Sequence, residues 1–214
     1  MNASEIKNRR FIVGAARFFS TVLSPLLMPS YGMFLILWGS FLSAQPAGQR
    51  IAVLIIMFGI TCILPMFFIS LLHNLKVIRD KRLNSAKERF WPYLLAILCY
   101  VGACFYLGHI HAPQWVIAFA AGGALACLIS MVVNMWWKIS AHMAGIAGLV
   151  ALIYSMHTQM LEAFNLKWVF VATLLLAGIL GSARIILRHH TFAQVLAGAL
   201  NGYLCVKLAM MLFG

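Results

Sequence analysis

The chain has 214 residues, of which 64% are hydrophobic and only 9% are charged. A soluble domain of this size needs far more polar surface, so the composition excludes a soluble globular protein and indicates a protein of the lipid bilayer. Sixteen Lys and Arg against four Asp and Glu give a formal charge of +12. Because these charges lie between apolar runs, we expect membrane lipids and a phosphate ligand as partners, and no nucleic acid.

The first 21 residues form a basic N-terminal segment. Within residues 8–20, three arginines alternate with Phe and Ile, which is typical of an interfacial amphipathic helix. The apolar part continues past Arg17 into a full-length apolar run, so we expect no cleaved signal peptide.

Seven apolar runs approach the roughly 20 residues that a membrane-spanning helix needs. They are residues 22–43, 51–73, 92–109, 115–134, 141–158, 167–183 and 191–213. We therefore predict an all-α, polytopic transmembrane helical bundle with six or seven spans. The linkers are too short for a soluble domain, so residues 1–214 are expected to form a single integral-membrane domain.

Alternation of these spans across the membrane places three polar loops on one face. The loops are residues 74–91, 135–142 and 182–190, and they are rich in Arg, Lys and His. We call this the basic face. The positive-inside rule assigns it to the cytoplasm, although a phosphate site would attract basic residues for its own reasons.

The five cysteines all lie inside apolar runs, without a CxxC pair or a Cys/His cluster. They are typical of small buried side chains rather than of a disulfide framework or a zinc site. Since the chain also lacks a cluster of carboxylates, we expect neither a metal nor another cofactor.

The first polar loop carries Arg82 and Arg89, which are seven residues apart. On a helix this spacing is two turns, so both guanidinium groups share a face and can bind a phosphate through paired N–H groups. The alternative is an ordinary solvated basic loop.

The second polar loop ends with Ser140, Ala141 and His142 at the start of a span. The first turn of a helix presents free N–H groups and the positive end of its dipole, so this position suits an anion. Ser140 is also a good N-cap, and His142 could be a simple interfacial residue. Lys138, beside Trp136 and Trp137, fits an aromatic belt or a contact with a headgroup.

The third polar loop contains Arg184 and His190, and Gln194 follows His190 by four residues. If both lie on one face of the last helix, Gln194 can hydrogen-bond one imidazole nitrogen and leave the other as a nucleophile or base. His189 would point about 100° away and face the headgroups.

These residues resemble the type 2 phosphatidic acid phosphatase superfamily, whose members carry K/R-x6-R-P, then P-S-G-H, then S-R-x5-H-x3-D. The resemblance covers about residues 80–200 and implies a catalytic core over about residues 74–200. It implies that His190 attacks phosphorus to form a phosphohistidine and that His142 protonates the leaving oxygen. It also implies that the phosphoryl oxygens bind Arg82, Arg89, Ser140, Ala141 and Arg184, without a metal.

The sequence departs from the family pattern at several positions: the proline expected directly after Arg89 is displaced to Pro92, and Ile139 replaces the proline of the second motif. Ala141 replaces a glycine, and Gln194 replaces an aspartate. An amide can orient His190 but cannot stabilise an imidazolium by charge, so we expect a lower rate rather than the loss of the site.

The resemblance implies an integral-membrane lipid phosphatase, expected in a bacterial inner (plasma) membrane. Its substrate would be a phosphomonoester or pyrophosphate of the phosphatidic acid, phosphatidylglycerophosphate or isoprenyl type. Two alternatives stay open: a lipid phosphotransferase with the same intermediate, and a catalytically weak lipid-binding or transport protein. Family members often face the exoplasm, so the side of the site is open, as is the oligomeric state.

Overall fold

A computed structural model describes residues 3–76 and 86–213. These residues are mostly helical, and the extended pairing that they form is one isolated bridge between Ser40 and Glu162. In chain order the helices are α1 (Ala3–Val22), α2 (Met28–Gly39), a short 3₁₀ turn (Phe41–Ala44), α3 (Ala47–Phe58), a π-helical turn (Gly59–Ile63), α4 (Leu64–Asn74), α5 (Ala86–His109), α6 (Gln114–Val133), α7 (Ala141–Thr158), α8 (Lys167–Ile186) and α9 (Phe192–Phe213).

Within the described ranges, six helical segments are long and apolar enough to cross a membrane. They are Ala47–Asn74, Arg89–His109, Gln114–Val133, Ala141–Thr158, Lys167–Ile186 and Phe192–Phe213. The predicted fold class, an all-α polytopic transmembrane bundle, is therefore confirmed, and the smaller of the two predicted span counts holds.

The prediction of one full-length span over residues 22–43 is wrong. Helix α1 ends at Val22, a turn containing Pro25 follows, and α2 has only 12 residues, a length of about 18 Å. Pro29 lies in the first turn of α2, where its missing N–H would have no intrahelical partner. The short helix is nevertheless deeply buried, and Met33 and Ile36 have no exposed surface.

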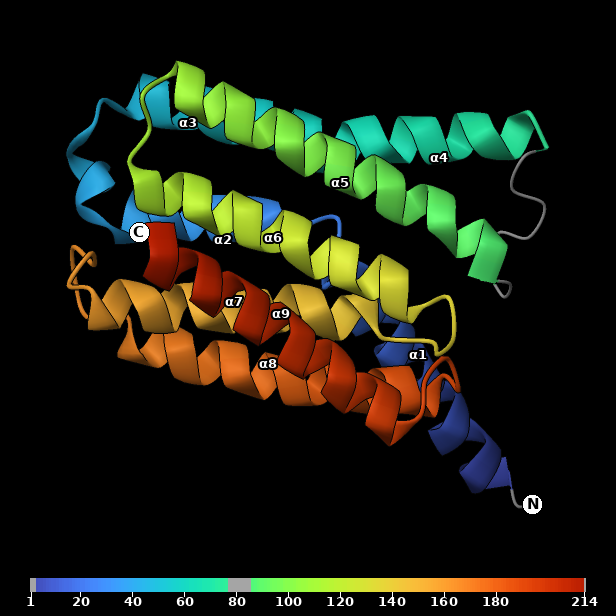
Figure 1. Cartoon of the computed structure of the whole chain (residues 1–214). Coiled ribbons are helices and arrows are strands. Elements are labelled where there is room, and N and C mark those ends of the chain that lie inside the picture. Colours follow the sequence, from blue (N-terminus) through green and yellow to red (C-terminus); the bar gives the residue numbers. More distant parts are fainter. Residues whose placement is uncertain (1–2, 77–85, 214) are drawn as a thin grey trace.

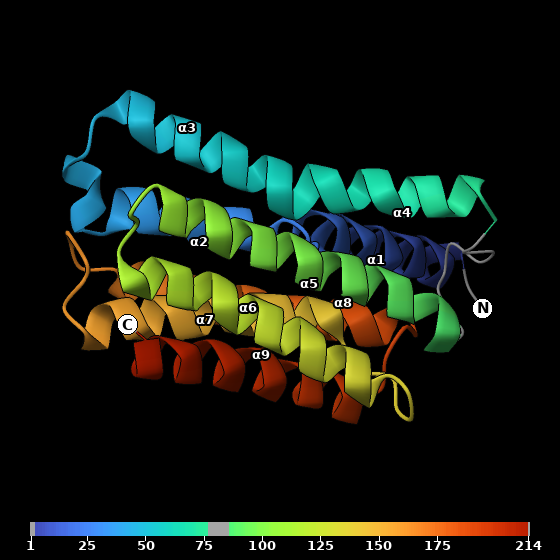
Figure 2. The same ribbon diagram turned by 45° about the horizontal axis from the view of Figure 1, so that its top comes forward.

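The segment Ala47–Asn74 is a continuous helix with a π-helical turn in its middle, at Gly59–Ile63. Pro65 follows directly and cannot donate the hydrogen bond that a regular α-helix would require there. The hydroxyl of Thr61 donates to the carbonyl of Met57 at 2.8 Å inside this turn. Figure 2 shows α3 and α4 along the outer edge of the bundle.

Helix α7 forms the centre of the bundle. Two thirds of its residues (67%) are buried, against 17% of the span within α5, and it contacts α2, α6, α8 and α9. Glycines let α9 approach it closely, because a Cβ at Gly202 would collide with the carbonyl of Ala144. The first turn of α7 is therefore held firmly in place.

The polar loops lie together at one end of the bundle, as predicted for the basic face. Figure 1 shows residues 134–140, residues 187–191 and the beginning of α5 at the same end, where α1 also lies, while the C-terminus is at the opposite end. Helix α1 packs against α8. Part of the first polar loop, residues 77–85, lies outside the described residues.

Candidate active site

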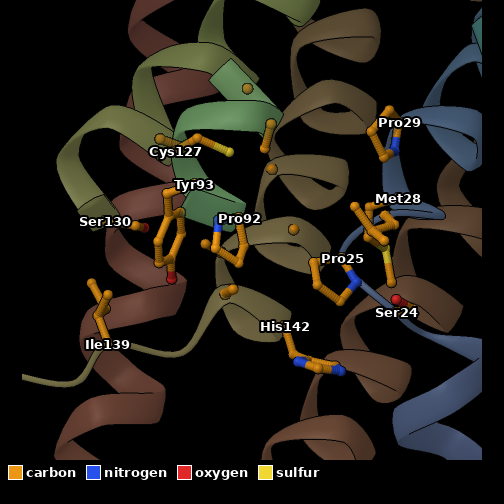
Figure 3. A pocket seen from close by; sticks show the side chains of 18 of the residues that line it. Ser24, Pro25, Met28, Pro29, Pro92, Tyr93, Cys127, Ser130, Ile139 and His142 are labelled. Atoms are coloured by element: carbon orange, nitrogen blue, oxygen red, sulfur yellow. The ribbon is translucent and has the colours of Figure 1, made fainter. Parts of the chain in front are cut away.

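A cavity of about 570 Å³ enters the bundle from the basic face. Much of its wall comes from single faces of three helices: residues 89, 92, 93, 96, 99 and 100 of α5, residues 119, 123, 126, 127 and 130 of α6, and residues 141, 142, 144, 145 and 148 of α7. Figure 3 shows the segment Ser24–Pro29 on one side, opposite Pro92, Tyr93 and Cys127, with Ile139 and His142 near one end.

The Arg, Lys and His side chains of the cavity gather at its end on the basic face. Arg89, Lys138, His142, Arg184, His189 and His190 all contribute to the lining. They come from the start of α5, the loop before α7, the first turn of α7, the end of α8 and the loop before α9. The predicted convergence of three distant polar segments is therefore present in the fold.

The rest of the cavity extends far into the bundle. On α6 the lining runs from Ser130 to Phe119, and on α5 it runs from Arg89 to Tyr100. Each stretch rises about 16 Å along its helix. Apart from a few polar groups, the deep lining is aliphatic, aromatic or thiol, so the cavity has one charged end and a long apolar body.

Several polar atoms at the charged end are buried without a hydrogen-bond partner. Eight such side-chain atoms occur in the part of the chain that the structure describes. Three belong to predicted site residues that line the cavity, namely Nε of Arg89, Nε of Arg184 and Nδ1 of His190, and a fourth, Oγ of Ser140, belongs to a predicted site residue that does not line it. Buried polar groups are normally paired, so their concentration here indicates room for a polar ligand.

Among the side chains that the structure describes (residues 5, 8–76 and 89–213), Arg89, Lys138 and Arg184 form no ion pair, and Glu162 pairs with His157 instead. Partial burial lowers the pKa of Lys138, and the charges of Arg89 and Arg184 lower it further. The three cations therefore share one electrostatic environment in which their charges are not neutralised, which favours an anion.

His142 and Arg184 meet at Ser20 of α1. Nη1 of Arg184 donates to the hydroxyl of Ser20 at 2.6 Å. Nε2 of His142 lies 3.0 Å from the carbonyl oxygen of Ser20 and 3.4 Å from its hydroxyl. A carbonyl only accepts hydrogen bonds, so Nε2 of His142 carries the proton of the neutral ring. Nδ1 is then the nitrogen that has the lone pair. Ser20 was not predicted from the sequence.

The second polar segment is arranged partly as predicted. Ser140 is the N-cap of α7, but its hydroxyl makes no capping bond; the side chain is fully buried and does not line the cavity. Ala141, the first residue of α7, does line it. Asn134 supports this segment, since its side chain donates to the hydroxyl of Tyr93 at 3.1 Å and accepts from the N–H of Ile139 at 3.4 Å.

The prediction that His190 and Gln194 share a face of the last helix is wrong. Helix α9 begins at Phe192, so His190 lies in the preceding loop. Gln194 forms a capping box with Thr191: its side-chain oxygen accepts from the Thr191 N–H at 3.1 Å, and its own N–H lies 3.4 Å from the Thr191 hydroxyl. The Gln194 side chain also has the predicted hydrogen-bonding interaction with His190. The pattern T-x-x-Q was the sequence signal for this cap.

His190 is nevertheless placed for chemistry. Burial lowers its pKa to about 4, and the positive charges of Arg184 and Lys138 add to this effect. The neighbouring Gln194 amide acts in the opposite direction. His190 is therefore neutral near pH 7 and has a lone pair on its ring.

The other candidate residues of the three polar loops differ in their surroundings. His189 also lines the cavity, but it is exposed, whereas Nδ1 of His190 is buried. Arg82 lies outside the described residues. Lys138, left open between an aromatic belt and a headgroup contact, lines the cavity, while Trp136 and Trp137 are exposed.

Comparisons of the chain with protein-family models, with curated proteins and with solved structures find no match.

Proposed function

We propose that the protein is an integral-membrane lipid phosphatase that hydrolyses a phosphomonoester or pyrophosphate of a membrane lipid. The observation that carries this proposal is the shape and charge of one cavity. Its end on the basic face holds Arg89, Lys138 and Arg184 without neutralising carboxylates among the described residues, and its body is apolar. A ligand that matches both parts has an anionic head and a hydrocarbon tail.

The charged end suits phosphoryl transfer in particular. In the transition state, the transferring phosphoryl group spreads negative charge over three equatorial oxygens, and fixed positive groups around these oxygens stabilise it. The buried, unpaired Nε atoms of Arg89 and Arg184 are donors available for these oxygens. The start of α7 at Ala141 adds backbone N–H groups and the positive end of a helix dipole.

His190 is the proposed nucleophile. Its neutral ring attacks phosphorus, a P–N bond forms, and the ester P–O bond breaks with its electron pair on the lipid oxygen. The negative charge of the bound phosphate favours the protonated form of His142, whose Nδ1–H gives its proton to this oxygen, and the lipid leaves as an alcohol, or as a monophosphate if the substrate is a pyrophosphate. Water then attacks the phosphohistidine, His142 takes the proton of the water, and phosphate leaves.

The arrangement of Gln194 favours a second candidate, a lipid-binding protein with little turnover. Its side chain is engaged in the helix cap with Thr191, and the described residues provide no carboxylate to stabilise a charged His190. Such a protein would use the same cavity to hold a phospholipid.

Purified full-length protein, tested with a panel of lipid phosphates, separates these candidates. A phosphatase releases inorganic phosphate from at least one member of the panel. If phosphate instead appears on an added alcohol, the protein is a phosphotransferase with the same intermediate. Saturable lipid binding without release or transfer would reject the phosphatase and favour the lipid-binding protein.

A further inference from the structure

Helix α1 supplies a residue to the charged end of the cavity. Its outer surface exposes Phe11 and Phe18, at 77% and 62%, while Ala16 on another side of the helix is buried. The helix packs against α8, and near its end Ser20 reaches both Arg184 and His142. The segment is therefore part of the site as well as a surface helix.

The hydroxyl of Ser20 orients the guanidinium of Arg184 without neutralising its charge. The hydroxyl accepts one N–H from Nη1 at 2.6 Å, while Nε of the same guanidinium stays buried and unpaired. A hydroxyl fixes the direction of the guanidinium plane but leaves its positive charge intact. A carboxylate at the same place would also fix the plane, but it would neutralise the charge that an anion requires.

The contact between Ser20 and His142 involves the backbone. The carbonyl oxygen accepts from Nε2, which fixes the ring tautomer and leaves Nδ1 for chemistry. Because this oxygen belongs to the main chain, replacing the side chain of Ser20 removes the contact with Arg184 and leaves the main contact with His142 in place.

We propose that Ser20 is a positioning residue, which aims the guanidinium of Arg184 at the phosphoryl group without neutralising it and holds His142 in one tautomer. The identity of the ligand, a phosphoryl group, rests on the proposed function. The consequence is that α1 completes the anion site, although it lies outside the segment, residues 80–200, that carries the family resemblance.

Binding of inorganic phosphate to the purified full-length protein tests this role independently of turnover. In Ser20→Ala we expect the affinity for phosphate to fall about tenfold, the scale of one hydrogen bond to a charged group. Ser20→Thr keeps the hydroxyl and should restore most of the affinity. Thr21→Ala is the matched control, because that exposed hydroxyl bonds only to the carbonyl of Arg17.

Ser20→Asp separates positioning from a purely structural role. In Ser20→Asp, the new carboxylate pairs with Arg184, so this variant should unfold at a higher temperature than Ser20→Ala. It should nevertheless bind phosphate more weakly than Ser20→Ala, because the charge of Arg184 is neutralised. If Ser20 had only a structural role, the more stable of the two variants, Ser20→Asp, would also bind phosphate more tightly. Equal phosphate affinity in wild type and Ser20→Ala, or phosphate affinity in Ser20→Asp at or above that of Ser20→Ala, would overturn the inference.

The proposed function can fail separately. If the wild type binds phosphate but turns over no lipid phosphate, the phosphatase is rejected while the role of Ser20 is still measured by the binding series. If turnover is present, Ser20→Ala should raise KM more than it lowers kcat, because Arg184 would hold the phosphoryl group before and during the reaction. A wild type that binds no phosphate would overturn both proposals.

Discussion

The backbone N–H of Ser140 donates to the carbonyl oxygen of Gln194 across a distance of 3.3 Å. This bond joins the loop before α7 to the first turn of α9, two segments separated by more than fifty residues. Both carry groups of the charged end, Lys138 and His142 on one side and His190 on the other. The site geometry therefore depends on how closely these two segments approach.

Gly198 controls that approach. A Cβ at this position would collide with the carbonyl of Ser140 and touch the side chain of Met143. Overpacking of this kind typically lowers stability by about 1–3 kcal/mol, so Gly198→Ala should lower the unfolding temperature in detergent and reduce any turnover. Gly102→Ala is the control, because a Cβ there has no neighbour within 4 Å. Equal loss in both variants would contradict this account.

Lys138 is predicted to contribute to phosphate binding. In Lys138→Met, the cavity loses one of three cations that share an electrostatic environment. We expect kcat/KM to fall about tenfold, with a weaker dependence on salt concentration. Lys167→Met removes a lysine at the start of α8, near the opposite end of the bundle, and should leave kcat/KM unchanged. Matched losses in the two variants would show a nonspecific effect of net charge.

The pH dependence follows from the lowered pKa of His190. The neutral ring is the nucleophile, so the acidic limb of kcat/KM that belongs to His190 should fall near pH 4 rather than near pH 6.5. Lys138→Met removes a positive neighbour, which favours the protonated ring and should move this limb to higher pH. A limb near 6.5 in the wild type, unmoved in Lys138→Met, would contradict the assignment.

The same shift predicts a loss of stability in acid. Between about pH 6.5 and 4, His190 is protonated in the unfolded chain but not in the folded one. The unfolded state then binds more protons, so the free energy of unfolding decreases as the pH falls through this window. His190→Gln should flatten this part of the stability profile, as measured by thermal unfolding in detergent at a series of pH values.

The apolar body of the cavity is predicted to hold the lipid tail. Ala96→Phe places a ring in the wall of α5 between Tyr93 and Tyr100, which all line the cavity. Hydrolysis of long-chain lipid phosphates should decrease at least tenfold, while a short water-soluble phosphate ester should react nearly as before. Leu98→Phe, at a side chain that is 57% exposed, is the control. Equal inhibition of both substrates would place the tail elsewhere.

The features that could be predicted from the sequence are those set by the length and order of its apolar runs. Six of the seven apolar runs match membrane-length helices within four residues at each end, and the parity of those runs predicted that distant polar loops meet at one face. Arg89, Ala141, His142, Arg184 and His190 do line one cavity. These predictions succeeded because the membrane limits a span to a narrow range of lengths.

Other features depended on contacts that a single sequence does not specify. Residues 22–43 looked like a span by hydropathy, but Pro25 and Pro29 divide the run into a turn and a short helix. The helix cap that Gln194 forms with Thr191 was not predicted, although Gln194 also interacts with His190 as expected. Ser20 reaches residues that follow it by 122 and 164 positions, and only the packing of α1 on α8 reveals this.

The most direct test of the phosphatase is the transfer of phosphate to His190. Full-length protein is mixed with a lipid phosphate labelled in the phosphoryl group, and both release and protein-bound label are measured. We predict labelled wild type with a phosphohistidine at His190, and no label and no release in His190→Ala. His109→Ala, at the opposite end of α5, should behave as wild type. Full phosphate release by His190→Ala would contradict the account.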